Sequence, residues 1–202
     1  MIGEDGTSVI RVLAPTAEDM RRIGSRLASL VRGGDVIVLS GPLGAGKTTF
    51  AQGFGRGLHI AGPIVSPTFT IARELVGRSS GGAPLRLVHV DAYRLGTLGF
   101  EPGQASADTL LDQLESLGLD EELDDPDEHT IVLMEWGSQM AAVLASARLE
   151  VSIERPLEPK PVRGKDEGCG VLSGDGPRTV VFRAVGPAWT QRMDDLRKAV
   201  EA

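Results

Sequence analysis

VIVLSGPLGAGKT, residues 36–48, joins an aliphatic run to a glycine-rich segment. The four aliphatic residues from Val36 to Leu39 predict a strand that is buried on both faces, as at the centre of a parallel sheet. The residues from Gly41 to Thr48 match the pattern G-x-x-x-x-G-K-[ST], and a helical pattern over 48–58 follows them. Strand, loop and helix therefore come in the order that a phosphate-binding loop requires.

The glycine-rich segment predicts a nucleotide site. Glycines let the backbone of such a loop point its N–H groups at phosphate oxygens, and the following helix adds its positive end. We expect Lys47 to reach the β- and γ-phosphates and the hydroxyl of Thr48 to bind Mg²⁺, which prefers oxygen ligands. The alternative is a glycine-rich turn that binds nothing. The predicted nucleotide-binding residues of this loop are Gly41, Leu43, Gly44, Ala45, Gly46, Lys47, Thr48 and Thr49.

Strands and helices alternate on both sides of the loop. Further strands are predicted over 9–13, 85–90, 131–134, 149–153 and 179–184, and further helices over 16–30, 108–117 and 188–200. Thr16 is the expected N-cap of the first helix, which Gly33-Gly34 ends. This alternation predicts a three-layer α/β fold of the P-loop NTPase type, with a mostly parallel sheet, helices on both faces and a C-terminal addition like a β-hairpin.

The chain length favours one domain over residues 1–202. Residues 155–178 stand apart because they contain four prolines and five glycines, and we expect them to form a flexible insertion within that domain.

Two acidic residues end predicted strands. Asp91 follows the run 85–90 and Glu135 follows the run 131–134, so both are expected at the carboxyl edge of the sheet, where ligands of open α/β folds bind. Both are candidate catalytic residues with Lys47, and the spacing leaves open which acid touches a metal. Trp136 could pack against the nucleotide or be an ordinary buried tryptophan. The chain contains no Asn, so the Asn-Lys-x-Asp guanine reader is absent and ATP is favoured.

The charge distribution argues against direct RNA binding. The formal net charge is −7, and seven acidic residues between Asp120 and Glu128 account for all of it. A protein that holds RNA alone normally carries a basic excess. An acidic start and short aliphatic runs predict a cytoplasmic protein without a membrane segment. The single cysteine excludes an intrachain disulfide, and the three histidines are too widely spaced for a zinc motif.

Four motifs in this order resemble one family. They are the phosphate loop, SPTFT at residues 66–70, HVDAYRL at residues 89–95 and MEW at residues 134–136. The chain resembles the TsaE (YjeE) family from about residue 16 to residue 153. These are small bacterial ATPases required for threonylcarbamoyladenosine, the modified adenosine beside the anticodon of tRNA.

The resemblance implies a Mg²⁺-dependent ATPase, weakly active alone, that acts on a complex of the TsaD and TsaB proteins. It would reach tRNA only indirectly, through that complex. By the match of motifs, Lys47 and Thr48 would hold phosphate and Mg²⁺, Glu135 would be the acid at the metal, and Asp91 would serve hydrolysis. Thr68 falls where a hydroxyl could sense the γ-phosphate, and the alternative there is a plain turn. Tyr93 and Arg94 could meet the partner or the phosphates, or could form only a surface salt bridge.

Two other functions remain open. A small-molecule kinase would use the same loop to pass the γ-phosphate to a metabolite. Arg73 and Arg78 could be its lid arginines, but no compact lid segment separates two predicted helices, which disfavours this function. A nucleotide-binding scaffold without turnover is disfavoured by the two acids at strand ends. Two features depart from the compact family pattern, namely the acidic run 120–128 and the insertion 155–178.

Overall fold

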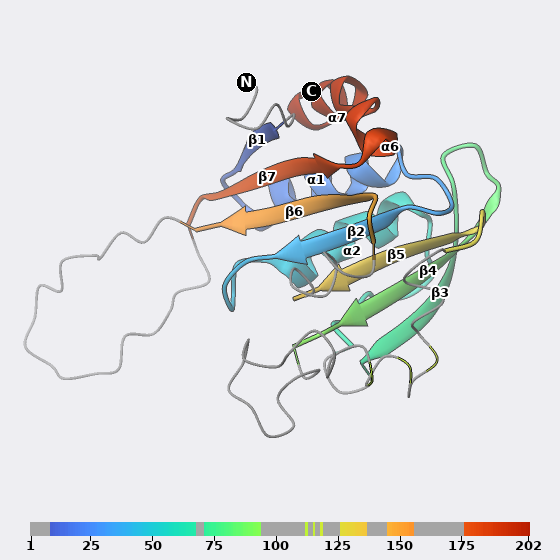
Figure 1. The fold of residues 1–202 in the computed structure, drawn as a ribbon. Coiled ribbons are helices and arrows are strands. Elements are labelled where there is room, and N and C mark those ends of the chain that lie inside the picture. Colours follow the sequence, from blue (N-terminus) through green and yellow to red (C-terminus); the bar gives the residue numbers. More distant parts are fainter. Residues whose placement is uncertain are drawn as a thin grey trace, which may run out of the picture.

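The protein forms a single seven-stranded sheet with helices packed against it (Figure 1). The computed structural model describes residues 9–67, 71–93, 112, 115, 118, 126–136, 145–155 and 176–202. The strands are β1 (Val9–Ala14), β2 (Val36–Ser40), β3 (Ala72–Arg78), β4 (Pro84–Asp91), β5 (Thr130–Glu135), β6 (Arg148–Glu154) and β7 (Arg178–Val185). The helices that lie wholly within the described residues are α1 (Ala17–Ala28), α2 (Lys47–Gly57), α6 (Pro187–Thr190) and α7 (Met193–Glu201).

The strand order is β1-β7-β6-β2-β5-β4-β3, which puts β2 in the middle. β2 pairs in parallel with β5 and β6, and β4 pairs in parallel with β5. Only β7 and β3 run against the other strands. β7 pairs antiparallel with its two neighbours, β1 and β6, and β3 pairs antiparallel with β4. The predicted mixed α/β architecture with a mostly parallel sheet is confirmed, and so is the central place of the 36–39 strand.

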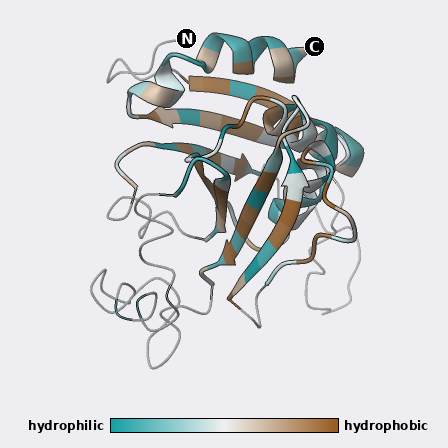
Figure 2. Ribbon diagram, turned by 90° about the vertical axis from the view of Figure 1, so that its right-hand side faces the viewer, coloured by the Kyte–Doolittle hydropathy of each residue, from teal (hydrophilic) through white to brown (hydrophobic). Residues whose placement is uncertain are grey.

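The sheet is buried on both faces. Along β2, Ile37 and Leu39 belong to a large core cluster that includes buried residues of α1, α2, α6 and α7. Val36 and Val38 point to the opposite face and join a smaller cluster with valines of β4 and β5. The strands accordingly show long brown stretches in Figure 2, whereas much of the C-terminal helix is teal. These four helices thus cover one face, and the predicted helix 108–117 lies almost wholly outside the described residues.

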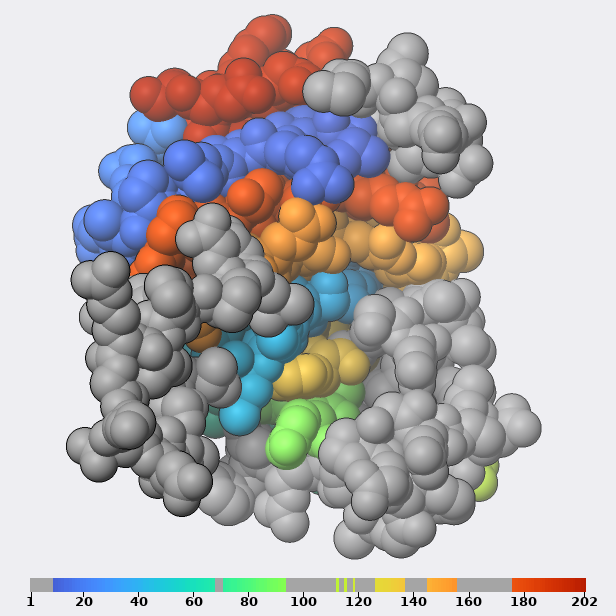
Figure 3. Space-filling view, turned by 90° about the vertical axis from the view of Figure 1, so that its left-hand side faces the viewer, coloured from blue at the N-terminus to red at the C-terminus, as the bar shows by residue number. Residues whose placement is uncertain are grey.

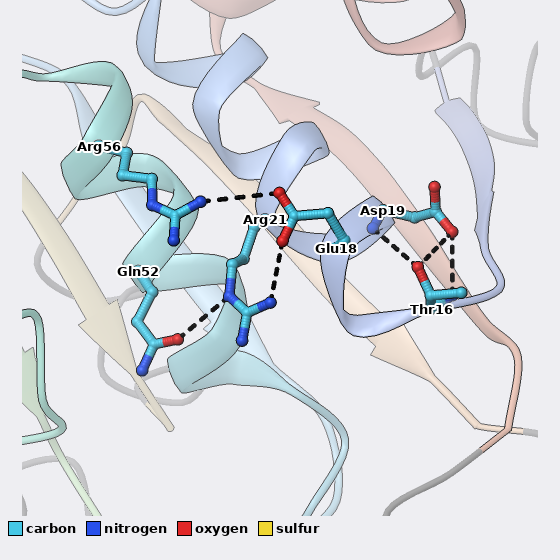
Figure 4. A network of polar contacts seen from close by, with 6 residues as sticks. All are labelled: Thr16, Glu18, Asp19, Arg21, Gln52 and Arg56. Atoms are coloured by element: carbon cyan, nitrogen blue, oxygen red, sulfur yellow. Dashed lines mark hydrogen bonds and ion pairs between the residues drawn. The ribbon is translucent and has the colours of Figure 1, made fainter.

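Helix α1 begins as its sequence predicts. The side chain of Thr16 accepts a hydrogen bond from the backbone N–H of Asp19, and a carboxylate oxygen of Asp19 accepts one from the N–H of Thr16 at 3.0 Å. This reciprocal capping box satisfies N–H groups that a helix start leaves unpaired. Figure 4 shows the first turns of α1 linked to α2, because Glu18 approaches Arg56 at 3.6 Å and Arg21 donates to the side-chain oxygen of Gln52 at 3.5 Å.

Helices α1 and α2 lie unusually close to each other because glycines face the contact. A Cβ at Gly24 would overlap the carbonyl oxygen of Phe50, and a Cβ at Gly53 would overlap that of Arg21. At Gly57 an added Cβ would lie 2.6 Å from the carbonyl oxygen of Ser25. Since α2 carries the end of the glycine-rich loop, this close contact fixes where the loop stands on the sheet.

The structure differs from the sequence analysis at three points. The patterned stretch 188–200 is two helices, α6 and α7, separated at Gln191 and Arg192, and the Arg192 side chain contacts Asp35 there, with Nη1 to Oδ2 at 2.9 Å. Strand β3 was not predicted, since its residues alternate weakly and most are not buried. Arg73 and Arg78 lie in β3 and not in a lid between helices.

The predicted C-terminal hairpin is present as the antiparallel pair β6 and β7, in register from Arg148↔Val185 to Glu154↔Thr179. Most of the predicted insertion 155–178 and all of Asp120 to Asp125 fall outside the described residues. None of the described helices is long and apolar enough to cross a membrane.

Candidate functional site

The glycine-rich loop turns sharply between β2 and α2. Gly41, Gly44 and Gly46 have φ angles of 144°, 73° and 111°, a region that side chains other than glycine rarely adopt. At Gly41 space is also restricted, because a Cβ there would lie 2.6 Å from the carbonyl oxygen of Ile153. Gly46 is the N-cap of α2, so the first turn of α2 opens directly from the loop. The sequence therefore places its glycines where the backbone requires them.

The loop forms one side of a pocket of about 800 Å³. Figure 3 looks onto the carboxyl ends of the parallel strands, and the cyan, yellow and green atoms of the loop region and of the ends of β5 and β4 lie together there in a recess. All predicted loop residues except Gly41 line this pocket, together with Asp91, Glu135 and Trp136. The other lining residues are Pro15, Thr16, Ala17, Met20, Ser66, Tyr93, Gly176 and Arg178.

Lys47 is buried at the base of the pocket. Its Nζ donates to the carbonyl oxygens of Gly41 at 2.9 Å and Pro42 at 3.2 Å, and it lies 3.5 Å from the centroid of the Trp136 ring. Burial lowers the pKa of Lys47 to about 8, although the charges of Glu135 and Asp91 act in the opposite direction. The ammonium group is thus poorly solvated, and an anion in the pocket would restore its usual preference for the charged form.

The two acids meet as predicted. β4 and β5 are parallel, and their register pairs Asp91 with Glu135, so the two carboxyl groups come from neighbouring strand ends. Asp91 is held from two sides, since its Oδ2 accepts a hydrogen bond from the Ser66 hydroxyl and its Oδ1 accepts one from the backbone N–H of Tyr93 at 3.0 Å. Both carboxylates are almost fully buried.

Glu135 has a histidine partner that the sequence analysis did not assign. Nε2 of His89 lies 2.9 Å from Oε1 of Glu135, and both side chains are buried. His89 is two residues before Asp91 on β4, so strand alternation puts it on the same face of the sheet. The signal in the sequence was the two-residue spacing of His89 and Asp91, but their partner on β5 could not be read without the strand register.

Trp136 lines the pocket next to Glu135 and Asp91. Its φ is 64°, its backbone N–H donates to the carbonyl oxygen of Leu39 at 3.0 Å, and its ring lies 5.1 Å from the ring of Tyr93. The side chain of Trp136 is partly buried, packs against the smaller core cluster and lines the pocket. Thr68 and Arg94 lie outside the described residues.

The opposite side of the pocket was missed by sequence reasoning. Arg178 comes from the start of β7, where it pairs with Ala14, and its Nε donates to the carbonyl oxygen of Ala45 in the loop at 3.3 Å. Met20 of α1 lies close to Gly46. These residues are far from the loop in the chain. Arg178 comes next to the loop because β7 pairs with β6, and β6 pairs with β2, the strand that the loop follows.

The described residues contain no group of three or more His, Cys, Asp or Glu side chains that could hold a metal ion by themselves. The oxygen donors at the pocket include the hydroxyl of Thr48 and the carboxylates of Asp91 and Glu135. This set suits Mg²⁺ bound with a nucleotide, because Mg²⁺ usually takes one or two protein oxygens and completes its shell with phosphate and water.

Comparisons with known proteins match this arrangement. The family model described as "Threonylcarbamoyl adenosine biosynthesis protein TsaE" matches residues 14–161. The protein named tRNA threonylcarbamoyladenosine biosynthesis protein TsaE from Mycobacterium tuberculosis strain H37Rv is 45% identical to this chain over 141 residues. The match covers 70% of this chain and 76% of that protein. The protein of that name from Bacillus subtilis is 32% identical over 181 residues, covering 90% of this chain and 89% of its own.

Among solved structures, the crystal structure of Bacillus subtilis YdiB is similar, with a TM-score of 0.62 and 27% identity over 95% of this chain and 96% of that one. The fold and site define an α/β protein with a glycine-rich, lysine-bearing loop at the carboxyl edge of a mostly parallel sheet. The chain belongs to the TsaE family, whose role lies in the biosynthesis of threonylcarbamoyladenosine in tRNA.

Proposed function

We propose that this protein is a Mg²⁺-dependent ATPase of the P-loop NTPase type that acts in the cytoplasm on a complex of the TsaB and TsaD proteins. It would support threonylcarbamoylation of tRNA without itself holding the tRNA. The observation that carries this proposal is the convergence of Lys47, Asp91 and Glu135 at one edge of the sheet, beside the G-x-x-x-x-G-K-T loop.

The loop and Lys47 would bind the phosphates. The first turn of α2 offers backbone N–H groups at the base of the pocket, and an α-helix start attracts anions. Lys47 now donates to carbonyl oxygens of its own loop, and phosphate oxygens are stronger acceptors that would also neutralise its buried charge. The lowered pKa of Lys47 supports this role, because it marks a cation without a sufficient counter-charge.

Thr48 and Glu135 are the proposed Mg²⁺ ligands, and Asp91 is the proposed residue that orients the attacking water. When bound, Mg²⁺ would offset the charge that develops on the transferred phosphoryl group. Asp91 suits its role because Ser66 and the N–H of Tyr93 hold both of its oxygens, so the carboxylate is fixed before a substrate arrives. A fixed group costs no reorganisation during the reaction.

The strand order gives the nucleotide its direction. The acids lie on β5 and β4, on one side of the loop that follows β2, and β6, β7 and β1 lie on the other side. If the γ-phosphate faces the acids, the nucleoside must extend toward the β1 and β7 side. The pocket there is lined by Pro15, Ala17 and Met20, whose apolar surface suits a base.

The mouth of the pocket suits a protein partner. Leu43 and Tyr93 line the pocket and are exposed, at 71% and 39% of their possible surface. A partner that covers the mouth would bury this apolar surface and could change the rate of hydrolysis. Nothing comparable favours the kinase alternative, since Arg73 and Arg78 lie in β3 and neither lines the pocket.

The experiment is ATP hydrolysis by the purified chain with Mg²⁺ or with a chelator, alone and with purified TsaB and TsaD, and with Lys47→Ala as the blank. We expect slow hydrolysis alone, faster hydrolysis with both partners and none in the blank. A rate that ignores the partners would overturn the proposed assembly. Transfer of the phosphate to a metabolite in place of water would establish the kinase instead.

A further inference from the structure

His89 is a buried polar residue that the proposed mechanism has not used. Its side chain is fully buried in β4, and its neighbours along the strand on that face are Leu87 and Asp91. On β5 the same face carries Leu133 and Glu135. A histidine among such residues is either a core residue with a satisfied ring or a group that acts on the acid beside it.

The hydrogen-bonding of His89 distinguishes the two readings. A carboxylate can only accept, so Nε2 is the ring nitrogen that carries the hydrogen and donates to Oε1 of Glu135 at 2.9 Å. The other ring nitrogen, Nδ1, is buried without a hydrogen-bond partner in the described part of the structure. The ring is therefore anchored through Glu135 alone. Burying a polar atom unpaired is unfavourable, and an apolar residue here would avoid that cost.

The contact also leaves Glu135 in a defined state. His89 uses Oε1, and Oε2 has no hydrogen-bond partner within the part of the chain that the structure describes. One oxygen of the carboxylate is thus fixed by the histidine, and the other is left for a ligand in the pocket. Histidine and carboxylate pairs of this kind commonly orient ligand groups around metal ions.

We propose that His89 is a positioning residue that fixes the carboxylate of Glu135 for binding the Mg²⁺–nucleotide complex. This inference rests on the proposed function, because it takes Glu135 as the acid at the metal. His89 itself touches neither nucleotide nor metal, since Glu135 lies between them and the pocket lining does not include the histidine.

Two amide substitutions provide a matched test. In His89→Gln the side-chain NH₂ lies near the position of Nε2 and keeps a donor for Glu135, whereas in His89→Asn it lies near Nδ1 and does not reach. The affinity for ADP is measured for both variants and the parent protein, once with MgCl₂ and once with EDTA. Thermal unfolding of each protein shows whether the fold is kept.

We expect equal ADP affinities in EDTA for all three proteins. The factor by which Mg²⁺ raises the affinity for ADP should be the same in the parent and in His89→Gln, and about tenfold smaller in His89→Asn. Full tightening in His89→Asn, or an equal loss in both variants, would overturn the positioning role. If the parent protein binds ADP without any effect of Mg²⁺, the proposed function itself fails, and the inference fails with it.

A measurement on the unmodified protein covers the case in which the variants do not fold. Long-range ¹H–¹⁵N correlation spectra report which ring nitrogen of each histidine carries the hydrogen. We expect His89 in the Nε2–H form, with a ¹⁵N shift that moves when ADP and MgCl₂ are added together but not with ADP in EDTA. An Nδ1–H form, or no movement with Mg²⁺ present, would contradict the inference.

Discussion

Burial of the Lys47 ammonium group is unfavourable in the free protein, and it places the charge where a ligand can bind. Its ammonium group is buried against the ring of Trp136 and two carbonyl oxygens of its own loop, with Glu135 and Asp91 as the acids nearby. These contacts do not replace the lost water, because burial still lowers its pKa to about 8. The lysine is therefore set for an incoming anion and is not a stabilising residue of the free protein.

The pH dependence of stability follows from that pKa. Between about 8 and the ordinary value of 10.5 the folded chain binds fewer protons at Lys47 than the unfolded chain, so this group makes the fold more stable as pH rises through that interval. In Lys47→Met the contribution is absent. This shift is worth about 2 kcal/mol between pH 8 and pH 10, so we expect the melting temperature of the parent, relative to Lys47→Met, to rise by roughly 4–8 °C over that interval. If the melting temperatures of the two proteins change with pH in the same way, the lowered pKa of Lys47 is contradicted.

Arg178 should support the loop from the far side of the pocket. Its Nε donates to the carbonyl oxygen of Ala45 at 3.3 Å, and a second guanidinium nitrogen donates to the carbonyl oxygen of Gly176. Lysine cannot reproduce two such bonds from one planar group. We expect Arg178→Lys to weaken the binding of ADP and of inorganic pyrophosphate to the same extent. A loss of about 1.4 kcal/mol in binding free energy would raise each dissociation constant roughly tenfold. Titration calorimetry with each ligand measures this, and a loss confined to ADP would place Arg178 at the nucleoside instead.

At the scale of elements, the contact between α1 and α2 positions the glycine-rich loop. An alanine at Gly53 would gain helix propensity worth about 1 kcal/mol, but its Cβ would overlap the carbonyl oxygen of Arg21. We expect Gly53→Ala to lower the free energy of unfolding by about 2 kcal/mol, because forcing the helices apart costs more than the propensity supplies.

Urea unfolding measures this loss, with Gly81→Ala as the control. Gly81 lies in the turn between β3 and β4, and the nearest atom to an added Cβ there is 3.8 Å away. The control should unfold within about 0.5 kcal/mol of the parent. A midpoint for Gly53→Ala as high as that of the control would show that α1 and α2 can separate without cost.

The C-terminal helices depend on one ion pair. Arg192 contacts both carboxylate oxygens of Asp35, and the two side chains are only 11% and 8% exposed. Removing one partner of a buried pair leaves the other charge without compensation, at a cost of about 3–5 kcal/mol. We expect Arg192→Ala to be destabilised by about 3 kcal/mol in urea unfolding. The double variant Arg192→Ala with Asp35→Ala should recover part of that loss, and strict additivity of the two substitutions would contradict the coupling.

These elements also show what a sequence can and cannot predict. β2, β4 and β5 were predictable because their aliphatic runs are buried on both faces, and the acids at their ends came with them. β3 could not be predicted from the sequence, because it is an edge strand and its most hydrophobic residue, Val76, is 78% exposed. The pairing of β2 with β6, which with the β6–β7 pair brings Arg178 to the loop, depends on contacts between residues far apart in the chain.

For the whole molecule, the pocket joins segments from most of the sheet. Its walls come from the loop after β2, the ends of β4 and β5, the start of α1 and the start of β7. A ligand there should therefore stabilise the fold as a unit. At 100 times its dissociation constant, ADP with Mg²⁺ should add about 2.7 kcal/mol to the free energy of unfolding.

Hydrogen exchange tests this at the level of backbone amides. With ADP and Mg²⁺, exchange should slow together in residues 41–49, 91–93, 135–136 and 176–178, and Lys47→Ala should show no slowing. Slowing restricted to residues 41–49 would mean that the ligand contacts the loop alone.

The two outermost strands of the sheet, β1 and β3, bear on how this protein behaves when it is concentrated. An open sheet can add strands from a second molecule at its margins, which is a route to fibrous aggregates. Arg11 in β1 is paired with Glu154 at 3.0 Å, whereas β3 carries Arg73 and Arg78 against the single acid Glu74. Pairing of two β3 margins would bring these arginines together. We therefore expect the charge on β3 to disfavour growth of the sheet from that margin.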